Sequence, residues 1–76
     1  ALAYESMRKG GNAPCILNAA NEIVVDAFLQ DKIGFLEISD IIETSLSKVS
    51  YIRSPKLEDY IFTDGETRRI VKELID

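Results

Sequence analysis

Apolar side chains recur at helical spacing along most of the chain, and no useful stretch alternates with the period of two that marks a strand. The pattern is richest between residues 14 and 30. Two rows of apolar residues there follow intervals of three, four and seven: Leu17, Val24 and Phe28, and Ile16, Ala20, Ile23 and Ala27. Val25 and Leu29 fall outside both rows. A helix that is apolar on more than one face is central in its domain, so we expect Pro14 to Gln30 to form the core helix.

The segment before this helix has its own start and stop signals. Residues Ala1 to Lys9 favour a helix by composition. The pair Gly10-Gly11 should end that helix, because glycine readily adopts the left-handed conformation just past a helix. Asn12 then suits the N-cap of the core helix, with Pro14 in its first turn.

A third helix is predicted from about Glu37 to Val49. Its apolar residues share one face, and its charged residues fall mostly on the opposite face; the apolar set is Ile38, Ile41, Ile42, Leu46 and Val49. The connection before it carries Ile33 and Phe35, which we expect to point inward. Leu36 occupies the place of the N-cap, so no good cap precedes this helix.

Residues 50–56 are predicted to form a loop, since Pro55 disfavours helical geometry at the residue before it. We expect a short helical turn from Leu57 to Phe62. A last helix should follow, beginning with a capping box formed by Thr63 and Glu66. It should run to about residue 75 and bury four apolar side chains: Ile70, Val71, Leu74 and Ile75. Short connections favour antiparallel neighbours. The sequence therefore predicts a single all-α domain, residues 1–76, folded as a compact bundle of about four helices.

The composition argues against several classes of function. The net charge is −4, from 9 basic and 13 acidic residues spread along the chain, whereas nucleic-acid binders concentrate Lys and Arg on one face. No apolar stretch approaches the ~20 residues that span a bilayer. The first residues lack the basic and apolar regions of a signal peptide, and there is no initiating Met. We therefore expect no nucleic-acid or membrane partner, and a cytoplasmic fragment of a longer reading frame.

Several catalytic arrangements are excluded because one residue type is missing. The sequence has no histidine, so neither a Ser-His-Asp nor a Cys-His pair can form. Cys15, the only cysteine, lies near a helix start where a thiol can become reactive, but the missing base favours a small packing residue. The run from Gly10 to Pro14 could cradle an anion, yet it matches no phosphate-binding fingerprint. The acidic residues lack the spacing of a calcium loop. We predict no catalytic, cofactor-binding or metal-binding residues.

The most unusual feature is a polar run within the core helix, Leu17-Asn18-Ala19-Ala20-Asn21-Glu22. Asn21 falls in the row of Leu17, so we expect it to be at least partly buried, where an amide needs hydrogen-bond partners. Asn18 and Glu22 form an i,i+4 pair on a neighbouring face. The more ordinary interpretation of Asn18, Asn21 and Glu22 is that they hold adjacent loops in place within the domain. The alternative is that this face docks on another domain.

The same run carries a family resemblance. Residues 12–22, followed by Val24-Val25 and Ala27-Phe28-Leu29, resemble the C-terminal domain of the 1-deoxy-D-xylulose 5-phosphate reductoisomerases. The similarity continues in the family's order through Ile33-Gly34-Phe35, Ile38, Ile41-Ile42, Leu57-Glu58-Asp59, Asp64 and Arg68. It covers nearly the whole chain, and the Leu-Asn-Ala-Ala-Asn-Glu run is its specific part. Cys15, Leu36 and Gly65 depart from the residues usual in the family, and Gly65 should slightly weaken the first turn of the last helix.

The resemblance implies one part of an enzyme. Complete members of the family convert 1-deoxy-D-xylulose 5-phosphate to 2-C-methyl-D-erythritol 4-phosphate, in non-mevalonate isoprenoid biosynthesis, with NADPH and Mg2+ or Mn2+. Their N-terminal domain binds NADPH, and their central domain carries the metal and the substrate. The resemblance therefore implies a structural and docking domain with no cofactor and no activity of its own. Its partners would be the NADPH-binding and catalytic domains of the same enzyme, within a homodimer.

Two other classes of function stay open. A free-standing helical protein-interaction module would need an apolar groove that accepts a peptide or a partner helix. A helix-turn-helix nucleic-acid binder is disfavoured by the acidic charge.

Overall fold

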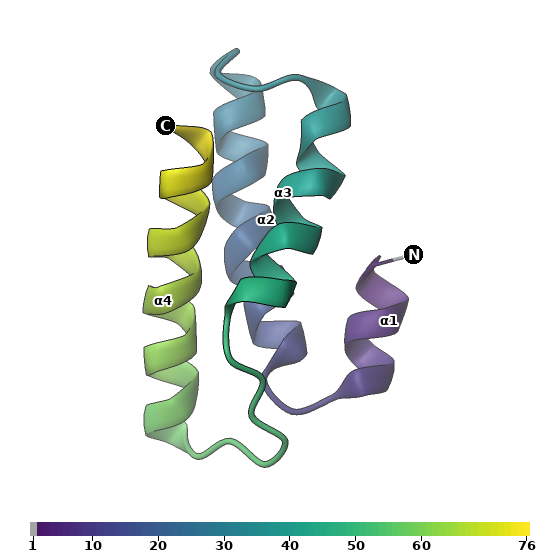
Figure 1. The fold of residues 1–76 in the computed structure, drawn as a ribbon, viewed down its shortest axis with the longest axis vertical. Helices are drawn as coiled ribbons and strands as arrows, with labels where there is room; N and C mark the ends of the chain where they lie inside the picture. Colours follow the sequence, from purple (N-terminus) through teal and green to yellow (C-terminus); the bar gives the residue numbers. More distant parts are fainter. Residues whose placement is uncertain (1) are drawn as a thin grey trace.

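Four helices run alternately down and up the molecule in the computed structural model, which describes residues 2–76 (Figure 1). They are α1 (Leu2–Lys9), α2 (Ala13–Leu29), α3 (Phe35–Lys48) and α4 (Leu57–Ile75). No strand occurs in this part of the chain. The predicted all-α class is therefore confirmed. Ala1, which the sequence assigns to the first helix, lies outside the described residues.

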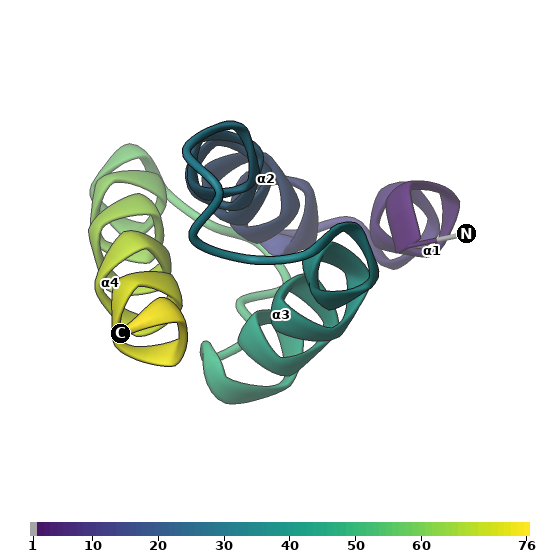
Figure 2. The same ribbon diagram turned by 90° about the horizontal axis from the view of Figure 1, so that it is seen from above.

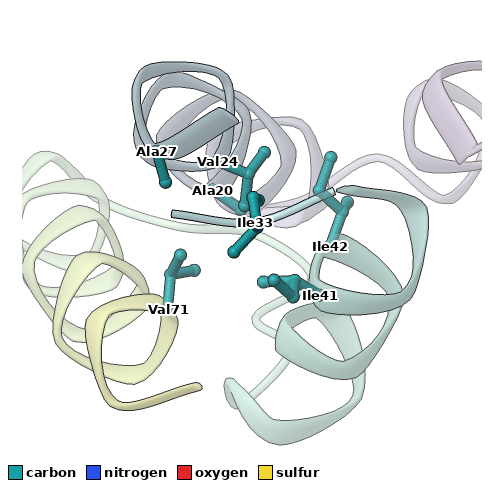
Figure 3. Close-up of a cluster of buried hydrophobic side chains, with 7 residues drawn as sticks. All are labelled: Ala20, Val24, Ala27, Ile33, Ile41, Ile42 and Val71. Carbon is teal, nitrogen blue, oxygen red and sulfur yellow. The ribbon is translucent and has the colours of Figure 1, made fainter. Parts of the chain in front are cut away.

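The core lies between α2, α3 and α4, while α1 lies to one side against α2 (Figure 2). Because the chain alternates in direction, α2 and α4 run parallel to each other and α3 runs antiparallel to both (Figure 1). Side chains from these three helices and from the loop after α2 meet in one cluster, drawn in Figure 3: Ala20, Val24, Ala27, Ile33, Ile41, Ile42 and Val71. Three of the seven come from α2, so the prediction that this helix is central is confirmed.

Two of the predicted inward side chains are exposed. Ile33 is buried as expected, but Phe35 is 71% exposed. Phe35 is the first residue of α3, and its ring instead packs edge-on against Phe28, with the ring centroids 5.9 Å apart. Leu74 is also exposed, because it lies at the edge of an open cleft between α3 and α4. The remaining predicted core residues of α3 and α4 are buried or half-buried.

α4 is a single helix from Leu57, so the predicted break and the capping box at Thr63 are wrong. Its start is fixed two residues after Pro55, where the Asp59 carboxylate accepts a hydrogen bond from the Lys56 amide at 2.9 Å. Thr63 lies two turns into the helix and is buried. A local capping signature was thus overridden by an equally local one seven residues earlier, where acidic residues also complement the helix dipole.

The ends of α2 and α3 also depend on residues other than the expected ones. α3 begins at Phe35, and the Glu37 side chain reaches back to accept a hydrogen bond from the Gly34 amide at 2.9 Å. α2 ends with Asp31 in the left-handed region (φ 59°), where the Lys32 amide donates to the Ala27 carbonyl at 2.9 Å. This is the hydrogen-bond pattern of a Schellman ending, which glycine usually serves. None of the four helices described is both long and apolar enough to cross a bilayer.

Gly65 lies in the middle of α4 rather than in its first turn, and a Cβ added there would meet no atom within 4 Å. We expect Gly65→Ala to raise the free energy of unfolding by about 0.5–1 kcal/mol, because alanine loses less backbone freedom than glycine in a helix. Urea unfolding followed by circular dichroism would measure the change. A lower free energy of unfolding in the alanine variant would contradict this expectation.

Candidate functional site

The three predicted polar residues, Asn18, Asn21 and Glu22, lie together on the exposed side of α2. The expectation that Asn21 is partly buried is wrong, since its side chain is exposed. The buried stripe of α2 is centred on the row that contains Ile16 and Ala20. The row of Leu17, to which Asn21 belongs, lies at the edge of that stripe: Val24 is buried, but Leu17 and Phe28 are only half-buried. Successive side chains of an α-helix are rotated by about 100° around its axis, and this rotation places the Asn21 side chain beyond the edge of the stripe, toward solvent.

Glu22 links α2 to α4 through Arg68. Its Oε2 atom accepts a hydrogen bond from Arg68 Nη2 at 2.6 Å, and Arg68 Nε donates to Asp64 Oδ2 at 2.9 Å. The hydrogen bonds to Asp64 and then to Glu22 raise the pKa of the Arg68 guanidinium above its ordinary value. Both partners of the interhelix pair are partly exposed, so the pair contributes no more than about 1 kcal/mol to stability. It fixes the relative position of the two helices rather than holding a loop.

Cys15 faces α4 from the first turns of α2. Its thiol lies 3.7 Å from the Tyr60 carbonyl oxygen. Partial burial raises the pKa of the Cys15 thiol, and the Asp64 carboxylate raises it further, against a smaller opposite effect of Arg68. Because a thiolate is the reactive form of cysteine, this environment agrees with the interpretation of Cys15 as a packing residue.

The raised pKa of the Cys15 thiol makes its contribution to stability depend on pH. That contribution is fully present below the ordinary pKa of a thiol and is lost as the pH rises through the higher folded-state value. We therefore expect the stability of the natural chain relative to Cys15→Ala to stay constant near pH 7 and to fall as the pH rises through and above about 8.5, the ordinary pKa of a thiol. Urea midpoints of both chains, measured across these pH values, test this. A difference that stays constant with pH would argue against it.

Asn12 does not cap α2 with its side chain, contrary to expectation, but forms a buried clamp between distant segments. The clamp consists of Asn12, Ser50, Ile52 and Thr63. The Asn12 amide nitrogen donates to the Ser50 carbonyl at 2.9 Å and to Thr63 Oγ1 at 3.0 Å, and its Oδ1 accepts from the Ile52 amide at 2.8 Å. Asn12 is 0% exposed. One side chain therefore holds the turn before α2, the loop after α3 and the second turn of α4.

The turn that carries this clamp does not form an anion cradle. Gly10 and Gly11 have positive φ values of 70° and 57°, which place the Asn12 backbone against the α3–α4 loop. The Asn12 amide donates to the Ile52 carbonyl at 3.0 Å, and the Ala13 amide donates to the Gly10 carbonyl at 3.1 Å. At least these two of the amides that could bind a phosphate are thus already paired within the chain.

Metal-ligating side chains are scattered over the surface. Within residues 2–76, no group of three or more Cys, Asp or Glu side chains is arranged to hold a metal ion. The fold and the site define a class: a small helical bundle, closed by a buried polar clamp, whose central helix carries an exposed face of amides, charges and apolar side chains.

A family model described as the DXP reductoisomerase C-terminal domain matches residues 1–70. The chain belongs to this family, and the resemblance found in its sequence is confirmed. A reductoisomerase of Bacteroides fragilis is 60% identical over 75 residues, covering 99% of this chain and 19% of that protein. One from Bacillus cereus is 47% identical over 74 residues, covering 97% of this chain and 20% of that protein.

A solved structure has the same fold. It is the 1-deoxy-D-xylulose 5-phosphate reductoisomerase from Zymomonas mobilis in complex with NADPH, which is 45% identical to this chain with a TM-score of 0.86. The match covers 99% of this chain and 20% of that one. The chain therefore spans about a fifth of the length of the relatives it matches.

Proposed function

We propose that the chain is the C-terminal structural and docking domain of a 1-deoxy-D-xylulose 5-phosphate reductoisomerase. The complete enzyme would convert 1-deoxy-D-xylulose 5-phosphate to 2-C-methyl-D-erythritol 4-phosphate as a cytoplasmic homodimer. NADPH would bind to its N-terminal domain, and Mg2+ or Mn2+ and the substrate to its central domain. The described residues of this chain contain no matching ligand set, so no chemical step is assigned to them.

One observation carries this proposal. Relatives named as reductoisomerases match 97–99% of this chain but contribute only about a fifth of their own length to the match. A domain that retains 60% identity over its whole length has kept both its core and its surface. In a family whose other domains bind the reactants, a conserved surface is best explained by contact with those domains.

The polar residues of α2 suit that role. Asn18 and Asn21 present exposed amides, and Glu22 is already oriented by Arg68. We propose Asn18, Asn21 and Glu22 as interdomain contacts. Their exposure favours a role as interdomain contacts over the interpretation that they hold adjacent loops in place, because residues that hold loops within a domain would be at least partly buried.

A domain exchange tests the proposed function. The segment of the Bacteroides fragilis enzyme that matches this chain would be replaced by residues 1–76. With NADPH, Mg2+ and 1-deoxy-D-xylulose 5-phosphate, we expect the chimera to oxidise NADPH within about tenfold of the parent enzyme, a loss of no more than ~1.4 kcal/mol in transition-state stabilisation. The enzyme truncated before the segment should be inactive, because its remaining domains lose their support.

The chain by itself should show no turnover in the same assay. The chimera and the truncated enzyme serve as its positive and negative controls. Activity of the isolated chain above the blank would overturn the proposed function, as would a truncated enzyme as active as the parent.

A further inference from the structure

Two rows of exposed side chains have the same spacing on α2 and on α4. On α2 the row is Asn18, Glu22, Val25 and Leu29, and on α4 it is Leu57, Ile61, Asp64 and Arg68. Each row advances by four, three and four residues, which keeps its members on one side of the helix. The eight residues are exposed except for Asp64 and Arg68, which are half-buried where they meet.

The two rows lie side by side on one face of the molecule. α2 and α4 run parallel and adjacent (Figures 1 and 2). Arg68 reaches Glu22 at 2.6 Å, so one member of the α4 row contacts one member of the α2 row. Lower in the same pair of helices, the Cys15 thiol meets the Tyr60 carbonyl at 3.7 Å. We call the surface formed by these eight residues the α2–α4 face.

The α2–α4 face has two apolar ends and a charged centre. Glu22 and Arg68 lie at the same level of two parallel helices (Figure 1). The residues before Arg68 in the α4 row therefore lie toward one end of the face, and the residues after Glu22 in the α2 row lie toward the other end. Leu57 and Ile61 are 77% and 67% exposed at the first end, and Leu29 is 73% exposed at the second. Single exposed apolar residues are ordinary. Several of them aligned on one face make a larger exposed apolar surface, and such surfaces mark interaction sites.

We propose that the α2–α4 face is the surface through which this domain docks on the rest of the same reductoisomerase chain. The inference rests on the proposed function and adds α4 to it. About four fifths of each matched relative lies outside the segment that this chain covers. The rest of the enzyme is large enough to cover two apolar ends that lie most of a helix length apart. It belongs to the same chain, so it is always close to this face.

A second copy of the chain suits this face poorly. The centre holds two carboxylates and one guanidinium, from Glu22, Asp64 and Arg68, which leaves one net negative charge. In a two-fold pair the same patch meets itself. Two such centres would face each other between the apolar ends, and like charges brought together across an interface oppose association.

Other exposed apolar residues provide internal controls. Leu36, on the first turn of α3, is 84% exposed and belongs to neither row. Tyr4 and Met7 are exposed on α1. If exposure alone determined docking, Leu36 would be covered as readily as Leu29.

Cysteine labelling distinguishes these surfaces. In a Cys15→Ala background, Leu29→Cys, Ile61→Cys and the control Leu36→Cys would be made in the isolated chain and in the Bacteroides chimera, in which the enzyme's own cysteines are replaced. Rates of reaction with a maleimide would be compared between the two contexts. We expect labelling at positions 29 and 61 to slow at least about tenfold in the chimera, because interface cores exclude solvent, and labelling at position 36 to change less than about twofold.

Each outcome decides between the two proposals. An active chimera with protected positions 29 and 61 supports the docking face. An active chimera in which both positions label as fast as in the isolated chain overturns this inference and leaves the proposed function standing. An inactive chimera overturns the proposed function and the docking inference with it. Labelling at 29 and 61 that slows as the concentration of the isolated chain rises would assign the face to a second copy instead.

Discussion

Replacing Asn12 with alanine should lower the free energy of unfolding by about 4 kcal/mol, because it leaves the buried Thr63 hydroxyl and two partly buried backbone groups, of Ser50 and Ile52, without partners. The Asn12 side chain makes three hydrogen bonds of 2.8–3.0 Å, and its partners lie 38, 40 and 51 residues away. Alanine fills none of the vacated volume. Water cannot readily replace Asn12 as the partner of the Thr63 hydroxyl, since Asn12 and Thr63 are almost completely buried.

The expected loss is a large share of the total stability. Domains of this size have free energies of unfolding of about 4–11 kcal/mol. Urea or thermal unfolding followed by circular dichroism would measure the change. Asn18→Ala is the matched control, because it removes the same amide from an exposed site on α2, the helix that Asn12 precedes, and it should change stability by no more than ~0.5 kcal/mol. Equal effects of the two substitutions would contradict the role given to the clamp.

Gly11→Ala should be nearly as damaging, with an expected loss of about 3 kcal/mol or more. Gly11 has a φ of 57°, and left-handed backbone costs a residue with a Cβ about 1–2 kcal/mol. The added Cβ would also overlap the Ile52 carbonyl oxygen and lie 3.0 Å from the Tyr51 ring. The Ile52 carbonyl accepts the Asn12 backbone amide, so it cannot move away without opening the clamp.

Gly10→Ala separates the backbone cost from the steric overlap in the loss expected for Gly11→Ala. Gly10 has a similar φ of 70°, but a Cβ there would meet no atom within 4 Å. Its alanine variant should lose only the backbone cost, about 1 kcal/mol. The difference between the two variants in urea unfolding therefore measures the steric overlap with the α3–α4 loop. If the two variants lost the same free energy of unfolding, the close approach of the Ile52 carbonyl would not be the reason for glycine at position 11.

Much of the fold could be predicted because its signals are local. The apolar rows of α2 and α3 are set by residues three and four apart, and these rows identified Val24, Ile41 and Ile42 as core. α4 was divided in error because two start signals lie close together. The Thr63–Glu66 pair matches a capping box, yet Asp59 caps the Lys56 amide first. Periodicity alone could not show which of the two start signals begins the helix.

The Asn12 clamp could not be predicted for a different reason. Its partners are a carbonyl of Ser50, an amide of Ile52 and a hydroxyl of Thr63, and two of these three groups are backbone atoms that carry no residue-specific signal. Asn12 before a helix is fully explained by capping, so its position in the sequence does not indicate a long-range role. The only local signal was the Gly10-Gly11 pair itself, because glycine accepts the backbone conformations that let another segment approach closely.

The candidate site was predicted in part. Asn18 and Glu22 were assigned to one face from their spacing, and the structure places them there together. Asn21 was misplaced because the sequence does not show where the centre of a buried stripe falls when two apolar rows overlap. The contribution of α4 was missed, since pairing Arg68 with Glu22 requires the helices to be parallel and adjacent. Their role as interdomain contacts stays a prediction.

The clamp also determines how a mechanical load would pass through the domain. α1 buries a single residue, Ser6, whereas its last turn is tied down: Tyr51 donates to the Lys9 carbonyl at 2.9 Å, and the Asn12 backbone pairs with Ile52 three residues later. Force applied to α1 would therefore be transmitted through residues 9–12 to the α3–α4 loop, and α1 would rotate about the two glycines. Because Leu2 at the start of α1 also packs against the core cluster, the same force would act on that contact as well as on the loop.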